Sequence, residues 1–153
     1  KRLKDAEEEL AYLVDVSGEL AGRRGPILFQ LPPYLKKDVE RLRDFVSLLP
    51  EGFMAAFEFR HPSWFEEEVY QVLSDGGVAL VVADTGEEDA TPLVATAAYG
   101  YARLRKEAYE PGELTRWAEK FADQGWQDAF VFFKHEDEGA GPALAREFVH
   151  ATN

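Results

Sequence analysis

The chain has no cysteine among its 153 residues, and it has only one methionine and three histidines. The absence of cysteine excludes a disulfide framework, a thiolate nucleophile and a cysteine-ligated zinc or iron–sulfur site. No apolar run approaches the roughly 18 residues that a membrane-spanning helix needs. The basic first residues lead into an acidic helical pattern rather than a signal-peptide core, so the composition predicts a cytoplasmic protein.

Basic residues are also scarce, since 17 Lys and Arg face 29 Asp and Glu, for a net charge of −12. Nucleic acid and anionic membranes repel such a chain as a whole, so we expect no membrane partner and do not favour nucleic acid. Any site for an anion must therefore be a local cluster of basic side chains. The hydrophobic fraction of 46% is sufficient for one globular core.

Five apolar runs predict strands, and no hairpin signal separates them. The strands are expected at about residues 27–31, 54–60, 78–84, 99–105 and 129–134. Amphipathic helical patterns precede the first strand and follow the first, second, fourth and fifth, and Ser63 is expected to cap the helix after the second. This order predicts an α/β fold with parallel strands. Two architectures fit: an open doubly wound sheet, or about five units of a (β/α)8 barrel.

The most informative segment is residues 57–64, which reads as a short buried strand that stops at a proline. Alternation places Glu58 and Arg60 on one face of this strand. Parallel-sheet enzymes carry their active sites at the C-terminal ends of the strands. The segment therefore predicts where a site lies, but it does not identify the reaction.

Six segments carry a resemblance to a known family: GPILFQLPP at 25–33, FEFRHPSW at 57–64, AD at 83–84, YARL at 101–104, WA at 117–118 and VFF at 131–133. In this order they resemble the domain of unknown function 72 family of TIM-barrel proteins. The resemblance implies that residues 1–153 form one partial barrel domain, equivalent to strands four to eight, without the N-terminal units. The family is named for its missing function, so the resemblance implies a fold and no reaction.

Alternation also indicates which polar side chains share a face with Glu58 and Arg60. If that face points inward, the expected substrate-binding residues on it are Gln30, Arg60, Tyr101, Arg103 and Lys134. Trp64 is a further expected substrate-binding residue, because its ring could stack on a sugar or a base. Arg105 and His135 are further candidates on the last two strands. Asp84 is expected on the same inward face, and the expected catalytic residues are Glu58, Asp84 and His61.

These residue types predict an enzyme that acts on a small anion, such as a sugar phosphate or a carboxylate. Arg60 and Arg103 would clamp the anion, because a guanidinium matches the geometry of both groups. Glu58 or Asp84 would act as acid or base, with a pKa set by burial and by the arginines. His61 is a second candidate for that role.

Each candidate also has a structural interpretation. Glu58 and Asp84 would then neutralise arginines as internal ion pairs, and His61 would bond to the backbone of its turn. Trp64 would pack beneath the loop. Gln30 would be a buried amide that neighbouring strands satisfy.

Two other classes of function stay open. One is a metal-dependent phosphodiesterase like endonuclease IV, to which the family has been likened in shape; several of Glu58, His61, Asp84, His135 and Glu136 would have to converge. The scarcity of histidine and the net charge oppose this class. The other is a non-catalytic barrel that binds a ligand at its mouth. No nucleotide fingerprint, Walker loop, HExxH motif or nucleophile elbow is present, so the cofactor is left unspecified.

Overall fold

A computed structural model describes residues 3–19, 24–86, 91–134 and 140–152. Within these residues the strands are β1 (Ile27–Gln30), β2 (Ala55–Glu58), β3 (Ala79–Asp84), β4 (Tyr99–Leu104) and β5 (Asp128–Phe133). The helices are α1 (Glu7–Gly18), α2 (Val39–Ser47), α3 (Glu67–Asp75), α4 (Glu113–Ala122) and α5 (Ala140–Ala151), with a 3-10 turn at Pro62–Trp64. The predicted strands agree with these bounds to within one or two residues.

The strands form one sheet in the order β1-β2-β3-β4-β5, and every neighbouring pair is parallel. The prediction of an α/β fold with a parallel sheet is therefore confirmed. Strands that follow one another along the chain are also neighbours in space. Their C-terminal ends consequently meet along one edge, which brings residues from all five strands together.

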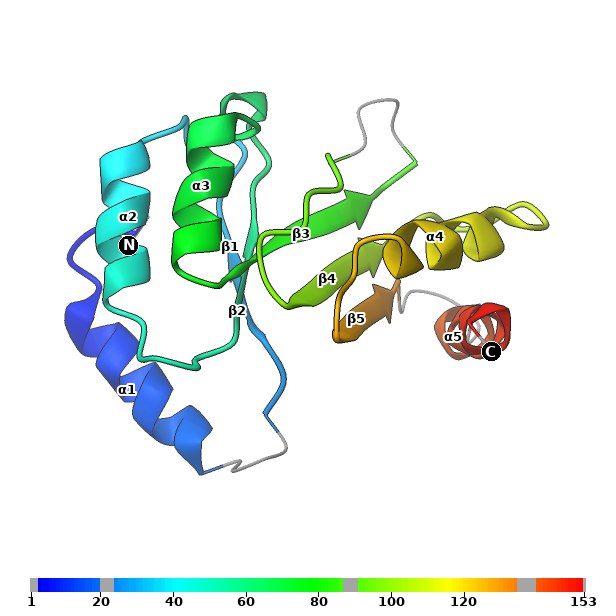
Figure 1. The fold of residues 1–153 in the computed structure, drawn as a ribbon, viewed down its shortest axis with the longest axis horizontal. Helices are drawn as coiled ribbons and strands as arrows, with labels where there is room; N and C mark the ends of the chain where they lie inside the picture. The colour runs from blue at the N-terminus through cyan, green and yellow to red at the C-terminus, as the bar shows by residue number, and fades with distance from the viewer. Residues whose placement is uncertain (1–2, 20–23, 87–90, 135–139, 153) are drawn as a thin grey trace.

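The helices cover one face of this sheet. The evidence is the strand register, in which the residues that pack against the helices all lie on the same face. Phe57 and Leu80 are register partners and belong to the core beneath α1, α2 and α3. Val82 and Leu104 lie on the same face and pack beneath α4 and α5. Figure 1 shows the two groups of helices beside β1 and β2 and beside β5. A doubly wound sheet carries helices on both faces, so this alternative is wrong.

The opposite face, called the inner face below, carries a smaller apolar cluster that includes Ala56, Ala79, Val81, Tyr99 and Tyr101. The Tyr99 hydroxyl accepts a hydrogen bond from the Ala55 amide and donates one to the Ala55 carbonyl, both at 2.9 Å. This side chain extends from β4 across β3 to β2, since Ala79 between them is small. That this sheet forms part of a TIM barrel stays a prediction.

Local signals at the helix ends explain most of the helix boundaries. The Asp38 carboxylate accepts a hydrogen bond from the Arg41 amide at 3.1 Å and caps α2. Helix α3 ends at Asp75 and is followed by Gly76 and Gly77. The φ of Gly77 is +61°, which favours glycine, and the Val78 amide donates to the Leu73 carbonyl at 3.0 Å. The prediction that Ser63 caps this helix is wrong, because Ser63 lies in the 3-10 turn that precedes it.

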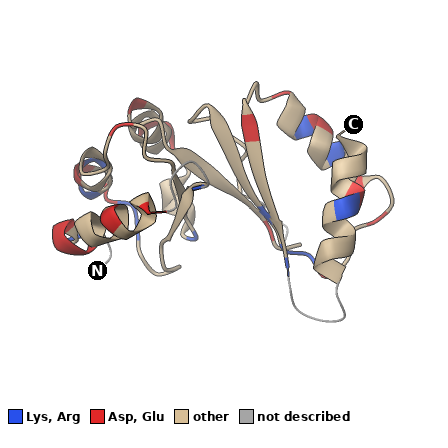
Figure 2. Ribbon diagram, turned by 90° about the horizontal axis from the view of Figure 1, so that it is seen from below, with Lys and Arg blue, Asp and Glu red and all other residues tan. Residues whose placement is uncertain are grey.

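Charged residues lie mainly on the helices and at strand ends, while the strands themselves are largely uncharged (Figure 2). This distribution is expected for a parallel sheet, because its strands are buried on at least one face by crossover helices. Among the residues that the structure describes, no helix is long and apolar enough to cross a membrane.

Candidate functional site

Glu58 is the centre of a charged cluster at the C-terminal end of β2, and only 4% of the residue is exposed. Its Oε1 accepts hydrogen bonds from Gln30 Nε2 at 3.0 Å and from Arg60 Nε at 3.5 Å. Its Oε2 accepts from Nη1 of Arg103. The carboxylate therefore joins β1, β2 and β4, which is the internal ion pair that the structural interpretation of Glu58 predicts.

Strand register explains how Glu58 and Arg103 meet although β3 lies between their strands. Arg103 is the register partner of Ala83, and Gln30 is the register partner of Glu58, so these side chains point to the inner face. The backbones of β2 and β4 are two strand spacings apart, which is about 10 Å, and two long side chains can bridge that distance. Ala83 leaves the space between them open.

A cavity of about 330 Å³ lies beside this cluster, toward β4 and β5. Its lining consists of Leu28, Tyr101, Arg103, Arg105, Phe132, Phe133 and Lys134. We call this space the basic cavity, because each charged residue among its described lining residues is a cation. Lys134 Nζ lies 3.8 Å from Oε1 of Glu107, whose side chain is 91% exposed and is not among the described lining residues.

Tyr101 supplies a hydroxyl that stays protonated beneath these cations. Burial raises the pKa of Tyr101, the nearby Arg103 opposes that change, and Glu58 adds to it. The side chain is only 7% exposed and stacks on Phe132, with the ring centroids 4.9 Å apart. Tyr101 therefore forms the floor of the basic cavity.

Arg60 lies at the rim of the cluster rather than in the cavity lining. Its side chain is 40% exposed, and its contact with Glu58 is the longest of the three. The structure thus brings Gln30, Arg60, Tyr101, Arg103 and Lys134 to one end of the inner face, as the alternation predicts.

Asp84 does not lie on that face, contrary to the prediction. It is the register partner of Leu104, so its side chain points to the helical side of the sheet. There its Oδ2 accepts from Trp117 Nε1 at 3.2 Å, and its Oδ1 accepts from the Gly86 amide at 3.0 Å. This buried carboxylate attaches α4 and the β3–β4 connection to the sheet.

A cavity of about 240 Å³ lies beside Asp84 on the helical side, and it contains charges of both signs. Lys106 Nζ donates to Glu113 Oε1 at 2.7 Å. This hydrogen bond raises the pKa of Lys106, and the same bond together with the Glu110 amide lowers the pKa of Glu113. Because Lys106 is engaged by Glu113, this space offers a weaker site for an anion than the basic cavity.

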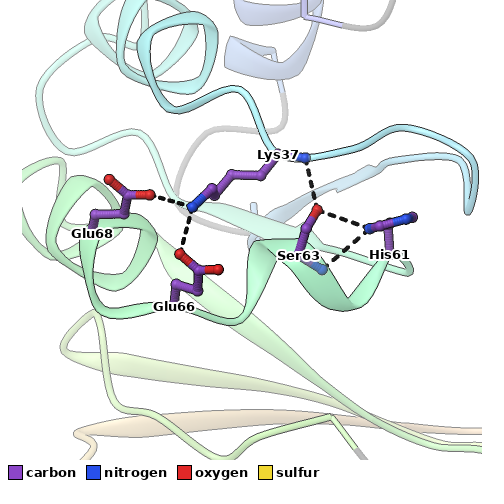
Figure 3. A network of polar contacts seen from close by, with 5 residues as sticks. All are labelled: Lys37, His61, Ser63, Glu66 and Glu68. Atoms are coloured by element: carbon purple, nitrogen blue, oxygen red, sulfur yellow. Dashed lines mark hydrogen bonds and ion pairs between the residues drawn. The ribbon is translucent and has the colours of Figure 1, made fainter.

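His61 lies in the turn that follows β2, and a hydrogen bond connects this turn to the loop that contains Lys37 (Figure 3). Its Nδ1 accepts from the Ser63 amide at 3.2 Å and lies 2.8 Å from Ser63 Oγ, which in turn accepts from the Lys37 amide at 2.9 Å. Lys37 also pairs with two glutamates of the α3 entrance. This arrangement matches the structural interpretation of His61, in which it bonds to the backbone of its turn.

Trp64 is placed in the core rather than at a ligand site. It has no exposed surface, it stacks on Phe59 with ring centroids 4.6 Å apart, and its Nε1 donates to the Leu35 carbonyl at 2.7 Å. A ligand therefore has no access to its ring. The sequence cannot separate these roles, since an aromatic residue after a strand can turn toward the mouth or beneath the loop.

Phe132 is a cavity residue that the sequence reasoning missed. It lines the basic cavity, and it is 46% exposed although it belongs to β5. Alternation along β5 and the residue after it places Phe130, Phe132 and Lys134 on one face. The pattern that predicted Lys134 as a site residue therefore also indicated Phe132.

Two larger cavities lie apart from the basic cavity. One of about 390 Å³ separates α1 from β1 and is lined mostly by apolar side chains. The other, of about 540 Å³, lies at the opposite end of the sheet between the ends of α2 and α3 and has charges of both signs. The described lining residues of these two cavities include no cluster of cations, so we favour the basic cavity as the anion site.

Metal ligands do not converge in the part of the chain that the structure describes, where no group of three His, Asp or Glu side chains could hold an ion. Glu58 is engaged by three donors, and Asp84 lies on the other face. His135 and Glu136, which also belong to the expected ligand set, lie outside the described residues.

Solved structures similar to this one have the same fold. A DUF72 family protein from Thermotoga maritima aligns with a TM-score of 0.77 and 26% identity, covering 98% of this chain and 65% of the other. A DUF72 family protein from Enterococcus faecalis aligns with a TM-score of 0.70 and 15% identity, covering 97% of this chain and 66% of the other. The chain therefore spans about two thirds of the length of these relatives, at 65% and 66%.

Among curated proteins no match is found. The profile of the family described as "Protein of unknown function DUF72" matches residues 1–153. The resemblance that the motifs indicate is thereby confirmed over the whole sequence. The chain belongs to the DUF72 family.

Proposed function

We propose that this chain binds a small anion, a phosphate or a carboxylate, in the basic cavity at the C-terminal ends of β4 and β5. Arg103, Arg105 and Lys134 would hold the anion. The observation that carries the proposal is the sign of the lining: among the described residues, the three charged ones are all cations, in a protein whose net charge is −12. Such a local concentration of positive charge attracts anions against the field of the whole molecule.

Glu58 positions Arg103 in this proposal and does not act as an acid or base. A carboxylate that accepts from three donors on three strands has its oxygens occupied. Its charge is needed to hold the guanidinium, since an arginine without its partner would lose its fixed orientation. The Glu58–Arg103 pair therefore preorganises the cavity before the ligand arrives.

Binding without catalysis is the favoured class for the described residues. Of the three predicted catalytic residues, Glu58 is engaged, Asp84 points to the helices and His61 caps a turn. A metal-dependent phosphodiesterase receives no support from these side chains. A cytoplasmic location stays a prediction from composition.

A thermal-shift titration with phosphate, sulfate, small carboxylates and divalent metal ions tests the proposal. We expect stabilisation by an anion, and its loss in Arg105→Gln, because Arg105 lines the cavity without pairing to Glu58. Arg43→Gln on the exposed surface of α2 is the matched control and should leave the shift unchanged. Stabilisation by metal ions alone, or an equal anion response in both variants, would contradict the proposal.

A further inference from the structure

The basic cavity has an aromatic wall as well as cations. Phe132 stacks on Tyr101 with the ring planes 27° apart, so one face of the Phe132 ring is covered. The ring is nevertheless 46% exposed, whereas Tyr101 is 7% exposed. Leu28 from β1 extends the apolar part of the lining. An exposed aromatic face thus lies next to three cations in one cavity.

A hydrated inorganic ion would use only the cationic part of this lining. An aromatic ring, in contrast, also gains binding free energy from stacking on an aromatic side chain. The cavity volume of about 330 Å³ is at the lower end of the range for small-molecule sites. It therefore accommodates a single ring with one charged group rather than an extended molecule.

We propose that the ligand is an anion that carries a planar ring, which stacks on Phe132 while its phosphate or carboxylate contacts Arg103, Arg105 and Lys134. This inference rests on the proposed anion site and adds the chemical class of the ligand. The ring and the charged group occupy the two chemically distinct parts of one lining. Both groups of residues come from β4, β5 and the ends of these strands.

Binding of phenyl phosphate, inorganic phosphate, benzoate and benzyl alcohol, followed by NMR shift changes on the full chain, tests this inference. We expect phenyl phosphate to bind on the order of ten-fold more tightly than inorganic phosphate, because only the former stacks. Comparison of benzoate with phenyl phosphate shows whether the site prefers a carboxylate or a phosphate. Benzyl alcohol, which has the ring without the charge, should bind most weakly.

Variants separate the ring from the charge. Phe132→Leu should reduce phenyl phosphate binding to the level of inorganic phosphate without changing the latter, while Phe132→Tyr, which keeps a ring, should retain the preference. Arg105→Gln should weaken both ligands. A thermal melt of each variant checks that the fold is intact.

The two proposals fail in different ways. Equal affinity for phenyl phosphate and inorganic phosphate, or a preference that survives in Phe132→Leu, would overturn the aromatic class and leave the anion site standing. No binding of any anion would overturn both. Binding of benzyl alcohol as tight as that of phenyl phosphate would show an apolar site and overturn the role of the cations.

Discussion

At the scale of single residues, the charge on Glu58 determines the geometry of the cluster. Its side chain is 5% exposed and that of Arg103 is 21% exposed, so water screens the pair only in part. Loss of either partner leaves a charge poorly compensated. We expect Glu58→Gln and Arg103→Met each to lower the free energy of unfolding by on the order of 3 kcal/mol, measured by urea denaturation.

A double-mutant cycle separates the pair from its surroundings. The coupling energy between Glu58 and Arg103 should be about 1–3 kcal/mol. The matched control is the exposed pair of Glu40 and Arg43, whose side chains are 78% and 56% exposed and whose coupling should be about 0.5 kcal/mol or less. Equal coupling in both cycles would mean that burial does not strengthen the Glu58 cluster.

Trp64 is expected to stabilise the fold and to play no part in ligand binding. Trp64→Ala removes a fully buried ring and its hydrogen bond to Leu35, which should cost about 3–5 kcal/mol of unfolding free energy. Tyr12→Ala removes a ring that is 72% exposed and should change stability by about 0.5 kcal/mol or less. A small effect of Trp64→Ala on urea denaturation would contradict its place in the core.

At the scale of elements, Gly100 lets β4 approach the loop that precedes β5. A Cβ atom at Gly100 would overlap the ring of Trp126, while one at Gly18 would meet no heavy atom within 4 Å. Gly100→Ala should therefore cost about 1–3 kcal/mol through overpacking. Gly18→Ala at the end of α1 is the control and should be neutral or stabilising by about 0.5–1 kcal/mol.

Urea denaturation of Gly100→Ala in a Trp126→Leu background identifies the cause. If the ring is the obstacle, the penalty for the extra methyl group should be smaller when the ring is absent. An unchanged penalty would instead assign it to the backbone of β4.

Glu113, in the first turn of α4, makes the free energy of unfolding depend on pH. Glu113 accepts from Lys106 and from the Glu110 amide, and its pKa lies below its ordinary value of 4.5. A carboxyl whose pKa is lower in the folded state contributes stability above its unfolded pKa, and this contribution is lost as pH falls through the folded pKa. Urea denaturation between about pH 6 and pH 3 should show a smaller decline in Glu113→Gln than in the native chain. An identical decline would contradict a role for Glu113.

Most of the elements could be predicted from the sequence, since periodicity and breakers are local. The direction in which each side chain of β3 points could not be predicted. Residues 78–83 are apolar at every position, so alternation does not show which of them face inward. The pairing of Asp84 with Leu104 and the hydrogen bond from Trp117, both visible only in the structure, show that Asp84 points to the helices. For β2 and β4, where charged and apolar residues alternate, the inward assignment of Glu58, Arg60 and Arg103 agrees with the structure.

At the scale of the whole molecule, the sheet has two strands that pair on one side only within the described residues, β1 and β5. Unpaired strand edges favour association between copies, and a net charge of −12 opposes it. We expect analytical ultracentrifugation to show self-association that increases with protein concentration and with salt, because salt screens the repulsion. A monomer at all concentrations and salt levels would show that the edges are protected.

Two side chains of β4 cross β3 on the inner face: Tyr99 passes over Ala79 to reach Ala55, and Arg103 passes beside Ala83 to reach Glu58. Both crossings depend on alanine, since a larger side chain would occupy the space that the bridge needs. Positions 79 and 83 should therefore evolve together with the residues that cross them. In relatives where position 83 carries a bulky residue, the Glu58–Arg103 pair should be replaced at both of its positions.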